Sequence, residues 1–181
     1  MFWLQYLQPD LVLGDSITAL APEILQQHQL RGLVLDVDET LVPLREQQVS
    51  PEIVDWVEQI RPVATIWLAS NNLSEARISS IAAALSLPYV LGARKPSRRK
   101  LRQAVEQMDL PVSQVAMVGD RLFTDVLAGN RLGLFTILVE PMVDPESATR
   151  SYPIRNFEVW LSQRLGVQLA QQQNITNDNK A

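Results

Sequence analysis

The sequence predicts an α/β fold, built on a mainly parallel β-sheet with helices on both of its faces. Short apolar segments rich in β-branched residues alternate with segments of helical periodicity through the middle of the chain. Most of these apolar segments lack the alternation of polar and apolar residues that marks a half-exposed strand. Parallel strands that are covered on both faces have this pattern, so the sheet is expected at the centre of the molecule.

Five of the apolar segments are predicted to be strands. They span residues 32–36, 63–69, 89–91, 115–118 and 134–139. Segments with helical periodicity lie between most of them, which is the connection that neighbouring parallel strands require.

Helices are expected at about 22–30, 51–60, 74–85, 97–108 and 124–132, and a final helix is expected to begin near Asn156. Ser50 followed by Pro51 is typical of an N-cap and the first position of a helix. Gly133 is typical of the residue that ends a helix, so the segment before it is predicted to stop there.

Length and composition indicate a single domain. The chain has 181 residues, of which 46% are hydrophobic and 20% are charged, as in an ordinary globular domain with a full-sized core. We expect residues 1–170 to form this domain. Residues 171–181 are rich in Gln and Asn and have almost nothing to bury, so they are predicted to be a disordered tail.

Charge and residue usage exclude several classes of function. A net charge of -4 gives no general attraction to nucleic acid, so no nucleic-acid partner is expected. The absence of cysteine excludes disulfides, thiolate metal sites and cysteine nucleophiles. The single histidine, His28, lies in a glutamine-rich stretch and offers no basis for a histidine triad or a zinc site.

The sequence favours a cytoplasmic protein. No run approaches the roughly 20 apolar residues that a membrane-spanning helix needs, and the N-terminus lacks the pattern of a signal peptide. The aromatic and apolar residues near the N-terminus leave a peripheral membrane contact open, although folding back onto the core is favoured. These residues are Phe2, Trp3, Leu4, Tyr6 and Leu7.

The first candidate functional segment is Asp36-Val37-Asp38-Glu39-Thr40, where the first predicted strand ends. Ligands of open α/β sheets bind at the carboxyl ends of the strands. Alternate residues of an extended segment point the same way, so Asp36 and Asp38 are expected in one cleft. Two such carboxylates suit a hard cation, or a nucleophile paired with a general acid. The alternative is a charged loop in which Thr40 satisfies backbone groups.

A second acidic segment follows the strand predicted at 115–118. It contains Asp120 and Asp125. If this strand is a neighbour of the first, three or four carboxylates meet at one edge of the sheet, and so much buried negative charge requires a cation. Mg²⁺ is the best candidate because only oxygen ligands are offered. The alternative for Asp125 is a first-turn acid that complements a helix dipole.

Two further segments offer groups that bind a phosphoryl oxygen. Ser70 and Asn71, at the end of the second predicted strand, provide a hydroxyl and loop amides. Lys95, after the third strand, provides a cation. Each is common in unrelated proteins. The four segments together are more specific, because the acidic pair, the serine, the lysine and the second acidic segment each follow a predicted strand, in this order.

In this order the four motifs, between Gly32 and Val139, resemble those of the haloacid-dehalogenase (HAD) superfamily. The likeness is greatest to the YqeG-type members of subclass III, which include phosphatidylglycerophosphate phosphatases. Residues 10–16 and 119–130 have this closer similarity. The resemblance implies a three-layer Rossmann-like fold with the first and fourth predicted strands side by side.

The resemblance also implies a role for each motif residue. Asp36 would be the nucleophile and Asp38 the general acid/base, while Ser70 and Lys95 would bind the phosphoryl group. Asn71, beside Ser70, is expected to bind substrate as well. Mg²⁺ would be held by Asp36, the main-chain carbonyl of Asp38, Asp120 and Asp125. An Asp two positions after the nucleophile favours phosphatase chemistry over that of dehalogenases or P-type ATPases.

The spacing of the motifs leaves no room for a cap domain, since only residues 41–49 separate the first motif from the next helix. An uncapped site suits a large or surface-bound substrate. A basic run lies beside it and either faces an anionic partner or is a solvated helix face. It consists of Arg94, Lys95, Arg98, Arg99, Lys100 and Arg102.

The function expected from the sequence is therefore Mg²⁺-dependent hydrolysis of a phosphate monoester through an aspartyl-phosphate intermediate. Phosphatidylglycerophosphate is the leading substrate because of the resemblance, and a lipid head group is the partner that it implies. A soluble phosphomonoester or a phosphoprotein is the alternative. A receiver-like signalling module is less favoured, because its acidic pair would precede the phosphorylated Asp by a strand or more, whereas Asp36 and Asp38 adjoin.

Overall fold

The computed structural model describes residues 4–142, which contain one sheet of six parallel strands in the order β1-β6-β5-β2-β3-β4. The strands are β1 (Leu11–Val12), β2 (Gly32–Leu35), β3 (Thr65–Ala69), β4 (Tyr89–Val90), β5 (Val115–Gly119) and β6 (Phe135–Leu138). All five predicted strands are confirmed. The edge strand β1 was not predicted, since its two residues become a strand only by pairing with β6.

Five α-helices connect the strands. They are α1 (Pro22–Gln27), α2 (Pro51–Ile60), α3 (Glu75–Leu85), α4 (Arg99–Gln107) and α5 (Leu127–Leu132). Short helical turns are η1 (Leu4–Leu7), η2 (Ile17–Ala19), η3 (Val112–Gln114) and the π-helical η4 (Leu122–Val126).

The predicted helix boundaries are confirmed most closely for α2. The hydroxyl oxygen of Ser50 accepts a hydrogen bond from the amide of Ile53 at 3.3 Å, as an N-cap should. The first predicted helix ends earlier than expected, because the backbone at Gln29 turns into the left-handed region with φ 56°. The helix predicted at about 124–132 begins earlier than expected, at Leu122, because the π-helical η4 runs directly into α5, which Gly133 ends with φ 84°.

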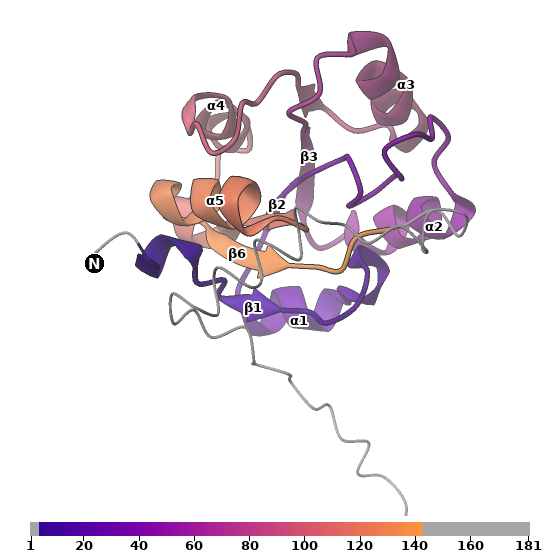
Figure 1. Cartoon of the computed structure of the whole chain (residues 1–181). Helices are drawn as coiled ribbons and strands as arrows, with labels where there is room; N and C mark the ends of the chain where they lie inside the picture. Colours follow the sequence, from indigo (N-terminus) through magenta and orange to yellow (C-terminus); the bar gives the residue numbers. More distant parts are fainter. Residues whose placement is uncertain (1–3, 143–181) are drawn as a thin grey trace, which may run out of the picture.

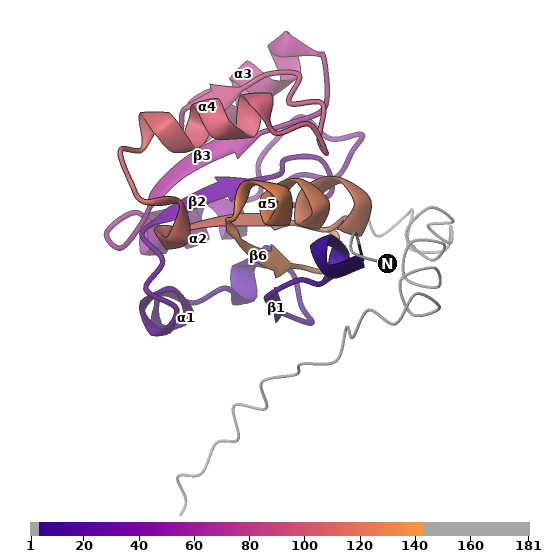
Figure 2. The ribbon, with the colours of Figure 1, turned by 90° about the vertical axis from the view of Figure 1, so that its left-hand side faces the viewer.

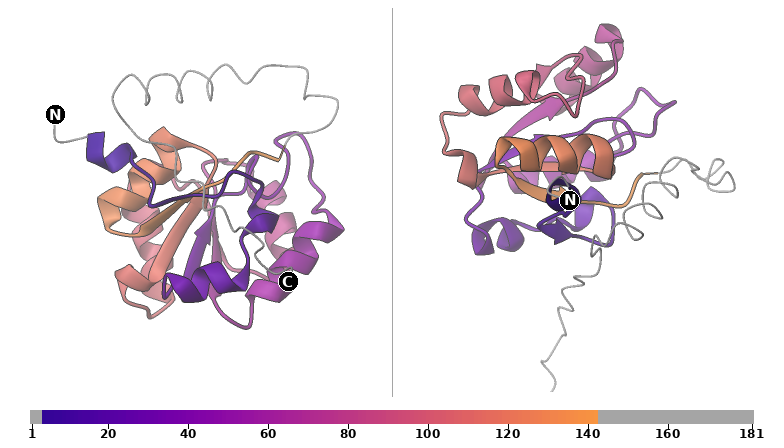
Figure 3. Two further views of the ribbon diagram at one scale, coloured as in Figure 1. Left: turned by 90° about the horizontal axis from the view of Figure 1, so that it is seen from below. Right: turned by 60° about the vertical axis from the view of Figure 1, so that its left-hand side comes forward.

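The helices form layers on the two faces of the sheet (Figures 1 and 3). Leu33 and Leu35 of β2 are fully buried in the cluster that also contains the apolar residues of α1, α2 and α3. Val34, which points to the other face, packs in the cluster formed by α4 and α5. Figure 2 shows α4 and α5 beside each other in front of the sheet. The predicted three-layer α/β architecture is therefore confirmed.

The order of the strands reverses between β2 and β5. From β2 the chain adds β3 and then β4 on one side, and it then crosses the other face of the sheet to place β5 on the opposite side of β2. Leu35 is in register with Val118, and the amide of Asp36 donates to the carbonyl of Val118 at 2.9 Å. The carboxyl ends of β2 and β5 therefore adjoin at the point where α/β sheets bind ligands.

The loop of residues 36–50 connects β2 directly to α2, so no cap domain is inserted there. Near the N-terminus Leu7 is completely buried, whereas Tyr6 is 37% exposed. Phe2 and Trp3, the helix predicted to begin near Asn156 and the tail predicted at 171–181 lie outside the described residues. No helix between residues 4 and 142 has the length and apolar character needed to span a membrane.

Candidate active site

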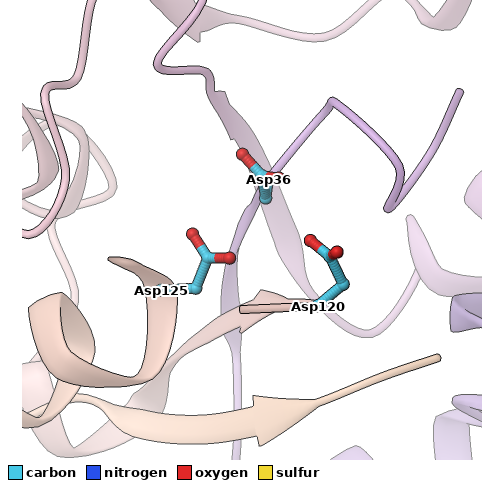
Figure 4. Close-up of side chains that lie close together, drawn as sticks. All are labelled: Asp36, Asp120 and Asp125. Atoms are coloured by element: carbon cyan, nitrogen blue, oxygen red, sulfur yellow. The ribbon is translucent and has the colours of Figure 1, made fainter. Parts of the chain in front are cut away.

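Three carboxyl groups converge at the carboxyl ends of β2 and β5 (Figure 4). Asp36 directly follows β2, Asp120 directly follows β5, and Asp125 lies in η4. One oxygen from each lies within 4.8 Å of an oxygen of the other two, and all three residues are buried. The sheet therefore brings together acids that lie far apart in the sequence.

Gly119 makes the position of Asp125 possible. A Cβ atom at residue 119 would lie 2.4 Å from the carboxyl carbon of Asp125, which is far inside van der Waals contact. The same carboxyl group is held by the main chain, because its Oδ2 accepts from the amide of Arg121 at 3.2 Å. The glycine and the π-helical turn together direct Asp125 towards Asp36 and Asp120.

Lys95 places its ammonium group among these acids. Nζ lies 2.5 Å from Oδ1 of Asp36 and 2.7 Å from Oδ1 of Asp125, and the side chain is 1% exposed. Burial by itself would lower the pKa of Lys95, but the carboxylates of Asp125 and Asp36 outweigh burial and raise it. Lys95 is therefore a permanent cation at neutral pH.

Burial also raises the pKa of two of the acids. It raises the pKa of Asp36 to about 7, with Lys95 opposing the rise and the neighbouring acids adding to it. It raises the pKa of Asp120 to about 8, where the charges of Asp125 and Asp36 act in the same direction. The nearby positive charge is thus too small to offset the effect of burial on Asp36 and Asp120.

The charge balance of the site fits a divalent cation. The three clustered carboxylates and that of Glu39 face two cations, which leaves two negative charges when all are ionised. The cations are Lys95 and Arg121, whose guanidinium pairs with Glu39 at 3.1 Å and lies 3.9 Å from Asp120. The nearby Asp38 pairs with Arg77. The donor set consists of oxygen alone, which is the set that Mg²⁺ prefers.

Asp38 lies beside this cluster and is held from two sides. Its Oδ2 accepts a hydrogen bond from the hydroxyl of Ser70 at 3.0 Å, and its Oδ1 is paired with the guanidinium of Arg77. Ser70 is completely buried, and its oxygen also accepts from the amide of Asn72 at 2.9 Å. Two of the predicted site residues, Asp38 and Ser70, are therefore in direct contact.

Arg77 was missed by the sequence analysis. It extends from α3 and also donates to the carbonyls of Pro43 and Glu46, so it ties the loop after the first motif to Asp38. Its relative exposure is only 8%. The sequence offered one indication that Arg77 is buried: it lies on the same face of α3 as the apolar residues Ile78 and Ile81.

Asn71 was predicted to bind substrate, and its side chain contacts Lys95. Its Oδ1 accepts from the amide of Lys95 at 2.7 Å, and its Nδ2 donates to the carbonyl of the same residue at 3.1 Å. The Asn71 side chain thus fixes the main chain from which the Lys95 ammonium extends.

The sequence has relatives among known phosphatases. A family model described as HAD-hydrolase-like matches residues 92–160. The chain is 33% identical over 132 residues to "Probable phosphatase YqeG" of Bacillus subtilis, a match that covers 72% of this chain and 76% of that protein. It is 25% identical over 151 residues to "Phosphatidylglycerophosphate phosphatase 1, chloroplastic/mitochondrial" of Arabidopsis thaliana, which covers 78% of this chain but only 43% of the plant protein.

The fold has a counterpart among solved structures. A predicted HAD-like family hydrolase from Porphyromonas gingivalis superposes with a TM-score of 0.50 at 12% identity, covering 77% of this chain and all of that one. At this identity the likeness concerns the fold alone.

Proposed function

The chain belongs to the HAD-like hydrolases and is a phosphatase, and we propose that it hydrolyses phosphate monoesters through an aspartyl-phosphate on Asp36 with Mg²⁺ as cofactor. The observation that supports this proposal best is the buried cluster of Asp36, Asp120 and Asp125 around the single ammonium of Lys95. It combines a carboxylate nucleophile with an excess of negative charge that a divalent cation would neutralise.

The carboxylates of Asp36, Asp120 and Asp125 and the main-chain carbonyl of Asp38 are the groups that would hold Mg²⁺. When bound, the ion draws negative charge from the phosphoryl oxygens and so lowers the barrier to attack by an anion. Asp36 and Asp120, whose pKa values burial raises, would bind the ion in their ionised forms.

In the first half-reaction a carboxylate oxygen of Asp36 attacks phosphorus, and the bond from phosphorus to the ester oxygen breaks. Asp38 donates a proton to the departing oxygen, which would otherwise leave as a high-energy alkoxide. Lys95 neutralises negative charge on Asp36 and on the phosphoryl group as they approach each other. The products are the free alcohol and the aspartyl-phosphate.

In the second half-reaction water attacks phosphorus, and the bond between phosphorus and Asp36 breaks. Asp38, now ionised, takes the proton of the attacking water, so the same carboxyl group serves as acid and then as base. Ser70 and Arg77 keep that carboxyl in one orientation through both steps. Phosphate leaves and Asp36 is restored.

We further propose phosphatidylglycerophosphate as the substrate and a cytoplasmic protein with peripheral contact to the membrane. The Arabidopsis relative, a phosphatidylglycerophosphate phosphatase by name, supports the substrate. The direct connection from β2 to α2 supports it as well, because a site without a cap is open to a head group at a surface. A soluble phosphomonoester or a phosphoprotein remains the alternative, and one experiment separates them.

The experiment measures phosphate release from four substrates with Mg²⁺ present. They are phosphatidylglycerophosphate in mixed vesicles, glycerol 3-phosphate, a phosphoserine peptide and p-nitrophenyl phosphate. We expect turnover of the aryl ester and a kcat/KM for the lipid at least about 100-fold above those for glycerol 3-phosphate and the peptide. A preference for either soluble substrate would reject the lipid, and no turnover of any substrate would reject the mechanism.

A further inference from the structure

A groove lined mainly by arginines lies between α4 and α5, on the face of the sheet that Figure 2 turns towards the viewer. Its volume is about 690 Å³. We call it the arginine groove, and its lining residues are Ser97, Arg98, Arg99, Arg102, Glu106 and Arg131. Arg131, which comes from α5, was not part of the basic run noted in the sequence.

The arginine groove contains four cations and one acid. All four arginines are exposed, and none of them takes part in an ion pair within the part of the chain that the structure describes. The other cations that the structure pairs are Arg61, Arg77, Lys95 and Arg121. The groove is therefore a concentration of positive charge, and within the described residues its one acid, Glu106, forms no ion pair with the arginines.

Two of the arginines shape the groove and two remain free to bind. Arg98 donates to the carbonyl of Arg131 at 2.9 Å, and Arg131 donates to the carbonyl of Pro96 at 3.2 Å. These bonds join the start of α4 to the end of α5. Within residues 4–142, the side chains of Arg99 and Arg102 make no hydrogen bond.

This arrangement is unfavourable without an anion. The first turn of α4 contains no acidic residue, and its cations oppose the positive end of the helix dipole. Four guanidinium groups around one hollow also repel one another. A bound anion would remove both penalties.

The groove lies next to the active site along the chain. Ser97 follows Lys95 by two residues, and the carbonyl that accepts from Arg131 belongs to Pro96, the neighbour of Lys95. A ligand in the groove and a substrate at Lys95 would therefore contact the same short segment.

We propose that the arginine groove binds the phosphodiester of an anionic phospholipid head group and so holds the protein on a membrane surface while the active site acts. This inference rests on the proposed lipid substrate. The guanidinium fork matches two phosphate oxygens at once, whereas an ammonium group is a point charge. Every cation that lines the groove is an arginine, while Lys100 of the same helix does not line it. A hollow lined in this way suits one phosphate group better than it suits a flat, diffusely charged surface.

The test is sedimentation with vesicles of phosphatidylglycerol and phosphatidylcholine, using the full chain with Asp36→Asn so that turnover cannot interfere. Relative to that parent, Arg102→Gln should bind at least about tenfold more weakly, and Arg99→Gln with Arg102→Gln about 100-fold, since each variant removes charge-assisted hydrogen bonds to the phosphate. Lys100→Gln is the matched control, because it removes the same charge from the same helix outside the groove. Its binding should weaken by no more than about fivefold, the effect of one charge near an anionic surface. If it weakens binding as much as Arg102→Gln does, the discrete site is rejected.

A comparison of Arg102→Lys with Arg102→Gln distinguishes a specific phosphate site from diffuse electrostatic attraction to the membrane. Arg102→Lys keeps the charge but removes the fork, so it should weaken vesicle binding almost as much as Arg102→Gln. Binding equal to that of the parent would overturn the proposal, because then only charge matters. Neither Arg99 nor Arg102 makes a side-chain hydrogen bond or ion pair within residues 4–142, and equal melting temperatures for all variants will exclude unfolding as a cause.

A third measurement identifies the source of the phosphate. Calorimetric titration with inorganic phosphate in EDTA should show no binding that depends on Arg99 and Arg102. If these variants lose phosphate affinity but still bind vesicles, the groove takes free phosphate and the lipid is rejected. Hydrolysis of p-nitrophenyl phosphate by the chain with intact Asp36 reports separately on the proposed function. Its absence would reject that function and leave the vesicle result standing.

Discussion

The ammonium nitrogen of Lys95 lies 2.5 Å from Oδ1 of Asp36, although the two residues are 59 positions apart in the chain. It also lies 2.7 Å from Asp125, so one buried cation bridges the residue proposed as nucleophile and a residue proposed to hold metal. Asn71 fixes the main chain of Lys95 from the end of the neighbouring strand. This contact makes the charge of Lys95 the first feature of the site to test.

Lys95→Met should lower kcat for p-nitrophenyl phosphate by on the order of 100-fold or more, because a preorganised charge next to the reacting group is removed. It should also destabilise the metal-free protein at pH 7 by about 3–5 kcal/mol, since removal of one partner leaves buried carboxylates uncompensated. Steady-state kinetics and urea unfolding measure the two effects. Unchanged kcat in a folded variant would show that Lys95 acts only in structure.

Asp36→Asn should abolish phosphate release, because an amide cannot form the aspartyl-phosphate. EDTA should abolish the activity of the unaltered protein, and added Mg²⁺ should restore it. Mass spectrometry after an acid quench should find a phosphate on Asp36 during turnover of the unaltered protein and none in the variant. Full activity of either the variant or the EDTA-treated protein would contradict the mechanism.

Asp38→Asn should affect substrates according to their leaving groups. An alkyl phosphate needs a proton on the departing oxygen and should lose about 10²–10⁴-fold in kcat/KM, the usual contribution of a general acid. An aryl phosphate leaves as a stable phenolate and should lose much less in the step that forms the intermediate. Single-turnover kinetics measure that step alone. Equal losses on the two substrates would argue against Asp38 as the acid.

The metal-free protein should become less stable as the pH rises from about 5 to 8. Burial raises the pKa of Asp36 to about 7 and that of Asp120 to about 8, so between the ordinary carboxyl pKa and these values the folded state binds more protons than the unfolded state. Stability then falls with pH, because folding favours the protonated forms.

Melting curves in EDTA across this range measure the effect, and Asp120→Asn should make the melting temperature depend less on pH. Mg²⁺ should raise the melting temperature more at pH 8 than at pH 6, since the acids must be ionised to bind it. A melting temperature that rises with pH in EDTA would reject this account of the site.

Gly119→Ala should weaken Mg²⁺ binding and destabilise the protein by about 1–3 kcal/mol, because the new Cβ would overlap the carboxyl group of Asp125. Gly32→Ala is the matched control. Its Cβ would meet the flexible side chain of Met108 at 2.8 Å, away from the acids. It should therefore lower stability while Mg²⁺ affinity, measured by calorimetry, stays the same. Equal loss of affinity in both variants would mean that Gly119 has no specific role in placing Asp125.

The sequence determined the elements whose signals are local. Runs of apolar residues predicted the five central strands, and the Ser50-Pro51 pair predicted where α2 begins, because capping and periodicity depend on neighbours in the chain. The same reasoning could not find β1, whose two residues pair with β6 more than 100 positions away. It also could not find the π-helical turn, which places Asp125 against Gly119.

For the site, the sequence determined which residues lie at the carboxyl ends of strands, since that follows from the motifs and from the parallel sheet. Only the tertiary structure decided how their side chains meet. Lys95 lies between Asp36 and Asp125, Asn71 contacts the Lys95 main chain, and Arg77 reaches Asp38 from a helix that has no motif of its own. The arginine groove likewise needs α5 to bring Arg131 beside α4. These relationships depend on the register of the strands and on the packing of helices across the sheet, which no short stretch of sequence specifies.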